Sequence, residues 1–409
     1  MEDYTPFGIT SDRSFVFDKM AEEMNRNDRA YYLDWIRIGV ILLLVLFHSA
    51  ITFSTHGDGF IRYPQSVPVM DIGLWFLSIW IMPVLFVVSG FASYRALQYR
   101  TSKQYLRERR AKLLIPFLAG LLLVCPPMVY LRALFMGSFE GSLLQFYPHF
   151  FTEGAYPKGY FNWGHLWFLI YLYVFTLILL PLFMRMMRER TRALLVAASA
   201  ILEKGVWIYL AAIPLMFTQT VLSPFFPGQY NLFWDWAHFT LYLGLVLYGF
   251  LFATNDRILD NIQRIRTVSL VLAILLFALE AFLQISGMGT VPGPISPAYN
   301  VLILFASLFA ALGYARRFLN QPSRVYYYLH RASFPFYILH FFPITVASYL
   351  IARRDLNVWL KYLIIVVFAY PSTLMLYEII RRIPVVRSLF GVKPFEEGTL
   401  KRDVRAERA

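Results

Sequence analysis

The chain has 409 residues, of which 58% are hydrophobic and only 15% charged, against roughly 25% charged in a typical soluble domain. Its net charge of +13 lies in short basic blocks between long apolar runs, which is the pattern of multi-span membrane proteins and does not indicate a nucleic-acid partner. The single cysteine, Cys125, excludes an internal disulfide and a multi-cysteine metal site.

Apolar runs of membrane-spanning length occur along the whole chain, each near the ~20 residues that cross a bilayer core. They cover 36–54, 69–94, 113–131, 164–184, 205–222, 237–253, 268–287, 298–315, 334–351 and 358–380. The fifth run is the least distinct, because 193–201 is also apolar and could form a surface helix or extend the span. The sequence therefore predicts an all-α, polytopic membrane protein of about ten transmembrane helices.

Lysine and arginine are concentrated in alternate connections, beginning with the basic stretch 95–112. Because basic loops stay in the cytosol, both termini are expected on that side. We predict a cytosolic segment over 1–30, a transmembrane domain over 31–382 and a basic cytosolic tail over 383–409, which is expected to be mobile from Gly391 onward. The polar N-terminal segment shows no cleavable signal-peptide pattern. The outer side would then carry the loops 55–68 and 132–163.

The first predicted span contains two ionisable residues, Arg37 and His48, and such residues inside spans are functional by default. At eleven residues apart they share one helix face and lie about 16 Å apart along the axis. Arg37 is at the cytosolic mouth, where Asp34 can pair with it. This spacing suits a coenzyme A thioester, with Arg37 gripping phosphate and His48 acting as general base. An interfacial anchor and an interhelical hydrogen bond are the alternatives.

Four segments resemble, in chain order, motifs of the acyltransferase-3 family of membrane acyltransferases. They are Arg-x10-His over 37–48, Phe86-Val-Val-Ser-Gly-Phe91 with the basic stretch 107–116 after it, His165-Leu-Trp-Phe-Leu169, and Phe334-Pro-Phe-Tyr-Ile-Leu-His340. The third segment is most similar to the glucans biosynthesis protein C-like branch, whose members are linked to succinylation of periplasmic glucans. The chain departs from many other members because no acidic residue closely follows Trp167, and it has no appended SGNH-type domain.

The resemblance implies an O-acyltransferase that moves an acetyl or succinyl group from cytosolic acyl-CoA to an extracytoplasmic carbohydrate, such as a glucan or surface polysaccharide. It assigns catalysis to His48 and donor binding to Arg37, Arg109 and Arg110, although the positive-inside rule alone also explains basic residues there. It implies acyl-CoA as co-substrate, no permanently bound cofactor, no metal, and a bacterial plasma or inner membrane. Direct transfer and an acyl-enzyme route both remain open.

Several other residues are candidates for supporting roles. Ser89, next to Gly90, is expected to allow a close helix approach and not to act as a nucleophile. His165 would meet the acceptor or orient His48, with a simple interfacial role as the alternative, and Trp167 would have a structural or orienting role. Weaker candidates are His340, the isolated Glu280, an Asp235–His238 pair, and the outer-loop aromatics Tyr156, Tyr160, Phe161 and Trp163, which could stack on sugar rings.

Two other classes of function remain open on the sequence. A transporter or flippase for a lipid-linked or small anionic substrate would use Arg37, His48 and Glu280 as a substrate or proton path, but the internal repeats and paired broken helices of many transporters are not visible. An acyltransferase of the separate MBOAT class would carry its essential histidine in a late span. The lipid bilayer is the other expected partner, and the oligomeric state is unknown.

Overall fold

The computed structural model describes residues 30–55, 61–64, 66–226, 228 and 231–392. The predicted N-terminal segment, apart from Ala30, and the tail from residue 393 onward lie outside the described residues. Within these ranges every regular element is a helix, and the β-type pairing found there is an isolated bridge between Ala155 and Phe161. The all-α prediction is confirmed.

Among the described residues, nine helical segments are long and apolar enough to cross a membrane. They are α2 (Tyr31–Ile51), α3 (Pro68–Tyr99), the run α4–η1–α5–α6 (Ser102–Met136), the run η2–α8 (Gly164–Met186), the run η4–α10 (Gly205–Leu222), α11 (Trp236–Ala253), α12 (Asp256–Ile285), α13 (Ser296–Phe318) and α16 (Val358–Ile380). The bent pair α14 (Arg324–Leu339) and α15 (Phe341–Ile351) makes a tenth span if counted as one.

Short helices connect or flank these segments. They are α7 (Leu143–Thr152), α9 (Glu189–Ala198), η3 (Ala200–Glu203) and α17 (Pro384–Leu389). The apolar stretch 193–201 lies in α9 and the start of η3, so it does not extend the fifth span. The predicted spans occur in the predicted order, and their number agrees with the prediction if the bent pair α14–α15 is counted as one span.

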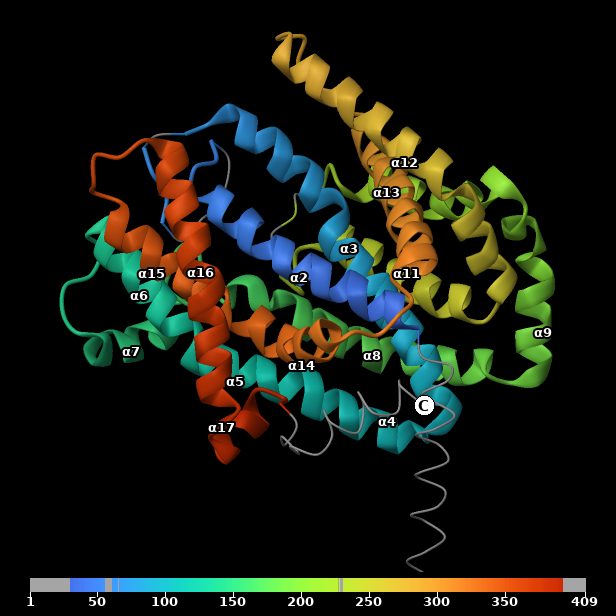
Figure 1. Ribbon diagram of the computed structural model, residues 1–409, viewed down its shortest axis with the longest axis horizontal. Coiled ribbons are helices and arrows are strands. Elements are labelled where there is room, and N and C mark those ends of the chain that lie inside the picture. The colour runs from blue at the N-terminus through green and yellow to red at the C-terminus, as the bar shows by residue number, and fades with distance from the viewer. Residues whose placement is uncertain (1–29, 56–60, 65, 227, 229–230, 393–409) are drawn as a thin grey trace, which may run out of the picture.

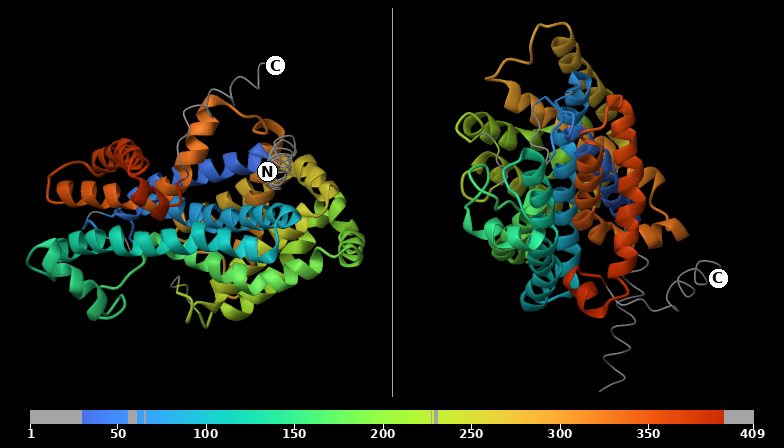
Figure 2. Two further views of the ribbon diagram at one scale, coloured as in Figure 1. Left: turned by 90° about the horizontal axis from the view of Figure 1, so that it is seen from below. Right: turned by 90° about the vertical axis from the view of Figure 1, so that its left-hand side faces the viewer.

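The first span, α2, lies in the middle of the bundle (Figure 1). It packs against α3, α13, α14, α15 and α16, and its side chains Leu44 and Val45 are almost completely buried. Two further views in Figure 2 show the helices of the bundle gathered around this core, and Figure 1 shows the far end of α12 projecting beyond it. Residues of α2 therefore contact several parts of the chain that are distant in sequence.

The basic stretch after the second span is helical, whereas the sequence suggested a connection ending near residue 112. Thr101 caps α4 (Ser102–Arg109): its hydroxyl accepts from the backbone N–H of Gln104, and the Gln104 side chain accepts in return from the Thr101 backbone N–H. This reciprocal capping box satisfies two of the donors that every helix leaves free at its start. The third span consequently begins about three turns before its apolar part.

A proline explains the irregular turn inside this third span. Pro116 has no N–H, and its ring would clash with the carbonyl four residues earlier, at Lys112. The helix widens there into the π-helical turn η1 (Arg110–Leu114), in which the Ile115 N–H donates to the Arg110 carbonyl. Such π-bulges are frequent at functional sites.

Two glycines bring α3 and α11 into backbone contact. A Cβ atom added at Gly90 would lie 2.1 Å from the carbonyl oxygen of Val246, and one added at Gly249 would lie 2.0 Å from that of Val87. Small residues permit such close packing between membrane helices. The close approach expected next to Ser89 is therefore present.

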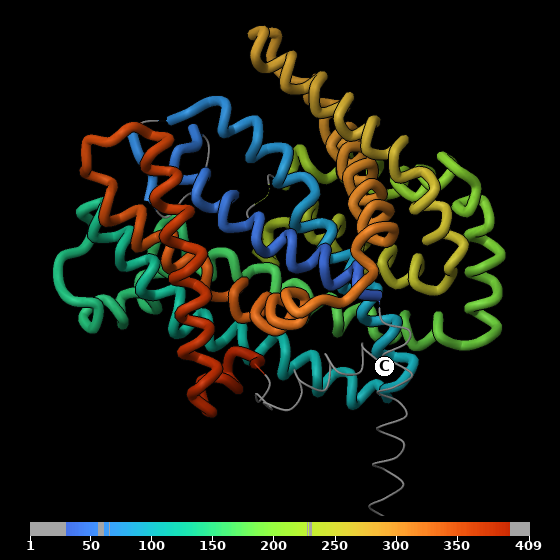
Figure 3. The backbone as a smooth tube through the Cα atoms, in the orientation of Figure 1, coloured from blue at the N-terminus to red at the C-terminus, as the bar shows by residue number. Residues whose placement is uncertain are grey.

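The span formed by α14 and α15 is broken where the two helices meet, at an angle of 51°, and the break can be followed in Figure 3. The last four carbonyls of a helix have no partner inside that helix. At the end of α14 these include the carbonyls of Tyr337 and Ile338, which bond to side chains instead. Both of these bonds are made by histidines.

Candidate active site

Three histidines from distant parts of the sequence meet inside the bundle. His48 comes from α2, His165 from η2 (Gly164–Leu166) and His340 from the break between α14 and α15. The ring centres of His165 and His340 are 5.1 Å apart, and those of His48 and His340 are 5.2 Å apart. The His48 and His165 rings are 6.3 Å apart. Two of the residues ranked as supporting or weak thus lie beside the predicted catalytic histidine.

The freed carbonyls of α14 hold two of the three rings. His165 Nε2 lies 2.9 Å from the Ile338 carbonyl oxygen, and His340 Nδ1 lies 2.7 Å from that of Tyr337. The Tyr337 hydroxyl donates to the His165 carbonyl, which ties η2 to α14 a second time. The positions of His165 and His340 are therefore set by the backbone at the helix break.

Apolar and aromatic groups surround this histidine cluster (His48, His165 and His340). The Phe341 ring stacks on His48 with centres 4.3 Å apart and meets His165 edge-on at 5.5 Å. On the other side, Gly120 of α5 (Ile115–Leu123) leaves room for Leu166 and Ile338, which a Cβ there would meet at 2.7 and 3.2 Å. Among the described residues, no group of three or more His, Cys, Asp or Glu side chains is arranged to hold a metal ion.

At the opposite end of α2, a polar cluster forms around Asp34. Its carboxylate accepts from Arg37 Nη1 at 3.0 Å and from the Tyr326 hydroxyl at 2.7 Å, and His330 Nδ1 lies 3.5 Å away. The side chain of Arg37 is 32% exposed, so its guanidinium is held in place yet open to a ligand. The predicted Asp34–Arg37 pair is therefore present, and Tyr326 and His330 of α14 contact the same carboxylate.

The two predicted donor-binding arginines of the third span differ: Arg109 is anchored by a hydrogen bond, whereas Arg110 is exposed. Arg109 Nη2 donates to Ser93 Oγ at 3.1 Å, and the Tyr105 hydroxyl donates to the same oxygen at 2.9 Å. Ser93 in turn donates to the Ser89 carbonyl, which gives Ser89 a main-chain role in this anchor. Arg110 is exposed at the start of η1.

Trp167 follows His165 by two residues, at the start of α8 (Trp167–Met186), and lies among aromatic rings. Its ring centre is 5.3 Å from that of Tyr242 and 6.0 Å from that of Phe86. It therefore packs α8 against α3 and α11, which is the structural role the sequence allowed.

The aromatics of the outer loop are half-buried and packed within their own segment. Tyr160 donates to the Ser138 carbonyl at 2.8 Å, and Tyr156 lies under the Arg132 guanidinium at 4.6 Å. Phe161 and Trp163 contact each other with centres 6.5 Å apart. The segment lies beside α6 (Cys125–Met136) and includes α7, at the end of the molecule where α6 and α15 lie side by side (Figure 1).

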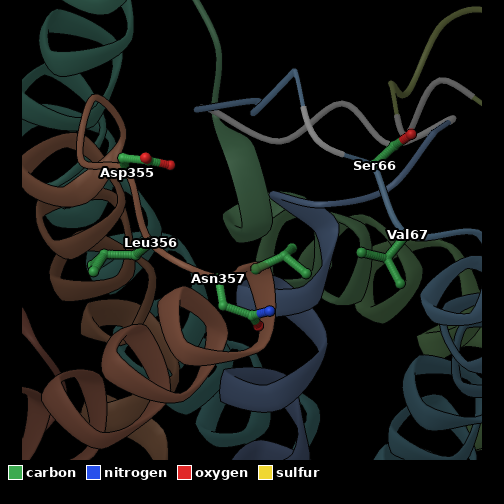
Figure 4. A pocket seen from close by; sticks show the side chains of 6 residues that line it. Ser66, Val67, Asp355, Leu356 and Asn357 are labelled. Carbon is green, nitrogen blue, oxygen red and sulfur yellow. The ribbon is translucent and has the colours of Figure 1, made fainter.

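An open pocket of about 380 Å³ lies between the loop after α2 and the turn before α16 (Figure 4). Its lining comprises Ser66, Val67, Asp355, Leu356, Asn357 and Val358. Nearby, the Tyr63 hydroxyl donates to the Ser348 carbonyl at 2.6 Å, and burial raises the pKa of Tyr63, so this phenol remains a donor. None of the histidine cluster lines this pocket.

Asp235 and His238 form the predicted pair, with 3.0 Å between Asp235 Oδ1 and His238 Nδ1. Asp235 also caps the start of α11 by accepting from the His238 backbone N–H. The pair therefore begins a helix and lies apart from the histidine cluster.

Glu280 is tied to its own helix and to the loop that follows. Its two carboxylate oxygens accept from Gln284 Nε2 at 3.0 Å and from the Val291 backbone N–H at 3.1 Å. Figure 1 places α12 away from α14 and α15. The structure does not bring Glu280 to the histidine cluster or to the polar cluster around Asp34.

We therefore expect Glu280→Ala to lower the free energy of unfolding by about 1–3 kcal/mol, because the buried Val291 N–H loses its acceptor. The kinetic constants of the acyl transfer that the sequence resemblance implies should remain those of the unaltered protein. Thermal unfolding in detergent and an assay of transfer on the same preparation check both statements. A stable Glu280→Ala protein with no activity would place Glu280 in the reaction path instead.

Sequence reasoning missed Tyr326, His330, Ser93 and Tyr105 as partners of the predicted donor-binding residues. Tyr326 and His330 are four residues apart at the start of α14, so they share one helix face, and this spacing was the available signal. Nothing in the sequence shows that this face meets Asp34, which is about 290 residues away.

The nine apolar helical segments and the bent pair α14–α15 found among the described residues, with an ionisable cluster inside the bundle, define a multi-pass membrane protein with an internal site. Residues 30–378 match the acyltransferase domain of the acyltransferase-3 family, so the chain belongs to that family. It is therefore a membrane acyltransferase that transfers groups other than aminoacyl groups. Membership favours this activity over the transporter and MBOAT alternatives.

Curated relatives include glucans biosynthesis protein C of Escherichia coli strain K12 and of the strains O139:H28 (E24377A / ETEC) and O81 (ED1a). Each is 24% identical over 388 residues, which covers 90% of this chain and 95% of the relative. No solved structure matches the chain.

Proposed function

We propose that the protein transfers an acyl group from cytosolic acyl-CoA to an extracytoplasmic carbohydrate, with His48 as the general base. The observation that carries the proposal is the arrangement of α2. One straight helix holds Arg37 in a polar cluster at one end and His48 in the buried histidine cluster about 16 Å further along its axis. A charged head and a long thin arm, as in coenzyme A, match these two clusters.

In the proposed reaction His48 accepts the proton of an acceptor hydroxyl as its oxygen attacks the thioester carbonyl carbon. The new C–O bond forms, the C–S bond breaks, and the departing thiolate of coenzyme A takes up the proton from His48, which regenerates the neutral imidazole. Arg37, Arg109 and the exposed Arg110 bind the phosphates of the donor, since guanidinium groups pair with phosphate oxygens bidentately. Ping-pong kinetics or a trapped acyl-enzyme would contradict this direct transfer.

The identity of the relatives supports a glucan as acceptor, because those proteins are named for glucan biosynthesis. We further propose an acetyl or succinyl group as the transferred unit and a bacterial inner membrane as the location, with both termini in the cytosol. The basic connections of the sequence support this orientation.

The decisive experiment measures free coenzyme A released by the detergent-purified protein from acetyl-CoA, succinyl-CoA and longer acyl-CoA donors, with and without glucose oligosaccharides. One donor should be consumed in a saccharide-dependent manner, and mass spectrometry should find the acyl group on the saccharide. A well-folded protein that consumes no donor with any saccharide would overturn the proposal.

Replacing Arg37 with alanine should raise the KM for acyl-CoA by about 10–100-fold, because a hydrogen bond to a charged group contributes about 1.5–3 kcal/mol. The KM for the saccharide should change little, since Arg37 lies at the opposite end of α2 from the histidine cluster. Initial rates over a range of both substrates check the prediction. An Arg37→Ala protein with an unchanged donor KM would show that Arg37 only anchors the helix end.

A further inference from the structure

The histidine cluster contains two imidazoles that the proposed reaction does not use. His165 is 5% exposed and His340 is completely buried. In each of the three rings one nitrogen is buried and has no hydrogen-bond partner: Nδ1 of His48, Nδ1 of His165 and Nε2 of His340. Unpaired buried polar atoms are unfavourable and rare, so three of them in one place indicate a site for a ligand.

The main chain fixes which nitrogen of His165 and His340 carries the proton. A carbonyl oxygen only accepts hydrogen bonds, so the Nε2 of His165 and the Nδ1 of His340 must be the protonated nitrogens. The remaining nitrogens, Nδ1 of His165 and Nε2 of His340, are therefore lone-pair acceptors. The cluster offers two fixed acceptors in rings whose centres are 5.1 Å apart.

A ligand for two neutral acceptors must bring hydrogen-bond donors. An anion would find two lone pairs and no hydrogen-bond donor on these nitrogens, so an anion does not fit. The described residues also give no arrangement for a metal ion. The aromatic surroundings formed by Phe341 favour a neutral molecule with apolar faces. A saccharide has both properties, because its hydroxyl groups donate hydrogen bonds and its ring has apolar faces.

The two extra histidines do not orient His48 directly. No hydrogen bond joins the three rings, and the buried nitrogen of His48 itself has no partner. An orienting histidine would instead hold the base through its second nitrogen. The acceptor nitrogens of His165 and His340 are therefore available to a ligand.

We propose that His165 and His340 form a hydroxyl-binding subsite for the acceptor, which holds a hydroxyl adjacent to the one that His48 deprotonates. This inference rests on the proposed function. It implies that the acceptor must present at least two hydroxyl groups close together, so a polyol is accepted and a simple alcohol is not.

The test measures saccharide binding without the reaction, by isothermal titration calorimetry of the purified protein with glucose disaccharides and their single-deoxy analogues. His340→Phe keeps the ring and removes the acceptor, and it should weaken binding at least tenfold. His340→Gln returns an acceptor oxygen and should recover most of the affinity. At least one deoxy analogue should bind the unaltered protein about tenfold more weakly. The matched control is His149→Phe, on the exposed helix α7, which should bind as the unaltered protein does.

Affinity for free coenzyme A, measured on the same samples, should be equal in all variants and shows that they are folded. Where transfer is observed, His340→Phe should raise the saccharide KM more than it lowers kcat. Transfer with an unchanged saccharide KM in His340→Phe would overturn the subsite and leave the proposed function standing. Saccharide binding that needs His340, in a protein that consumes no donor, would support the subsite and contradict the function. An unaltered protein that binds none of the disaccharides would overturn the subsite.

Discussion

Replacing His48 with alanine is expected to slow acyl transfer by about 10²–10⁴-fold, which is the usual contribution of a positioned general base. His48 is the member of the histidine cluster on α2, and neither of its ring nitrogens is held by a main-chain carbonyl as those of His165 and His340 are. It can therefore take a proton and turn toward a substrate more freely than its neighbours. The loss should appear in kcat, with the donor KM nearly unchanged.

The measurement is release of coenzyme A from the donor that the unaltered protein consumes. His149→Ala is the control, because His149 is exposed and paired with Glu153 outside the bundle. A His48→Ala protein that keeps more than a tenth of the activity would exclude His48 as the base. In that case the neighbouring His340 would be the next residue to replace.

Gly90→Ala should destabilise the protein by about 3 kcal/mol or more, at the upper end of the range for overpacked sites. The new Cβ would lie 2.1 Å from the Val246 carbonyl oxygen and 2.7 Å from the Phe250 backbone nitrogen. Backbone atoms cannot move aside by a change of rotamer, so α3 and α11 must separate. Thermal unfolding in detergent should show the loss directly.

Gly39→Ala provides the matched comparison for this substitution. Gly39 is also inside a membrane-spanning helix, but a Cβ there would meet nothing within 4 Å. Alanine favours helix over glycine by about 1 kcal/mol, so stability should stay the same or rise. Equal destabilisation by both substitutions would show that the α3–α11 contact is not as close as described.

The spans were predictable because each has to satisfy the same physical requirement, about 20 apolar residues with their backbone bonded internally. The predicted fifth span, 205–222, coincides with the run Gly205–Leu222. The start of the third span was not predictable in this way. Its first turns are polar, and their helical state depends on the Thr101 cap and on the accommodation of Pro116 at η1.

The candidate site was predictable only where its residues share one helix. Arg37 and His48 could be placed on one face of α2 from helix geometry alone. His165 and His340 could not be ranked beside them, because their positions depend on contacts between η2 and the end of α14, 173 residues apart. The same limit hid Tyr326, which meets Asp34 across the bundle.

Because Arg37 and His48 lie on a single helix, both the distance between them along the axis and the angle between them around the axis are fixed. Inserting one residue between them would advance His48 by only 1.5 Å but turn it by about 100° around the axis. Asp34 and Tyr326 fix the first end of α2, and the rings of His340 and Phe341 surround the other. The segment between them should therefore accept changes in the identity of its apolar residues far more readily than a change in their number.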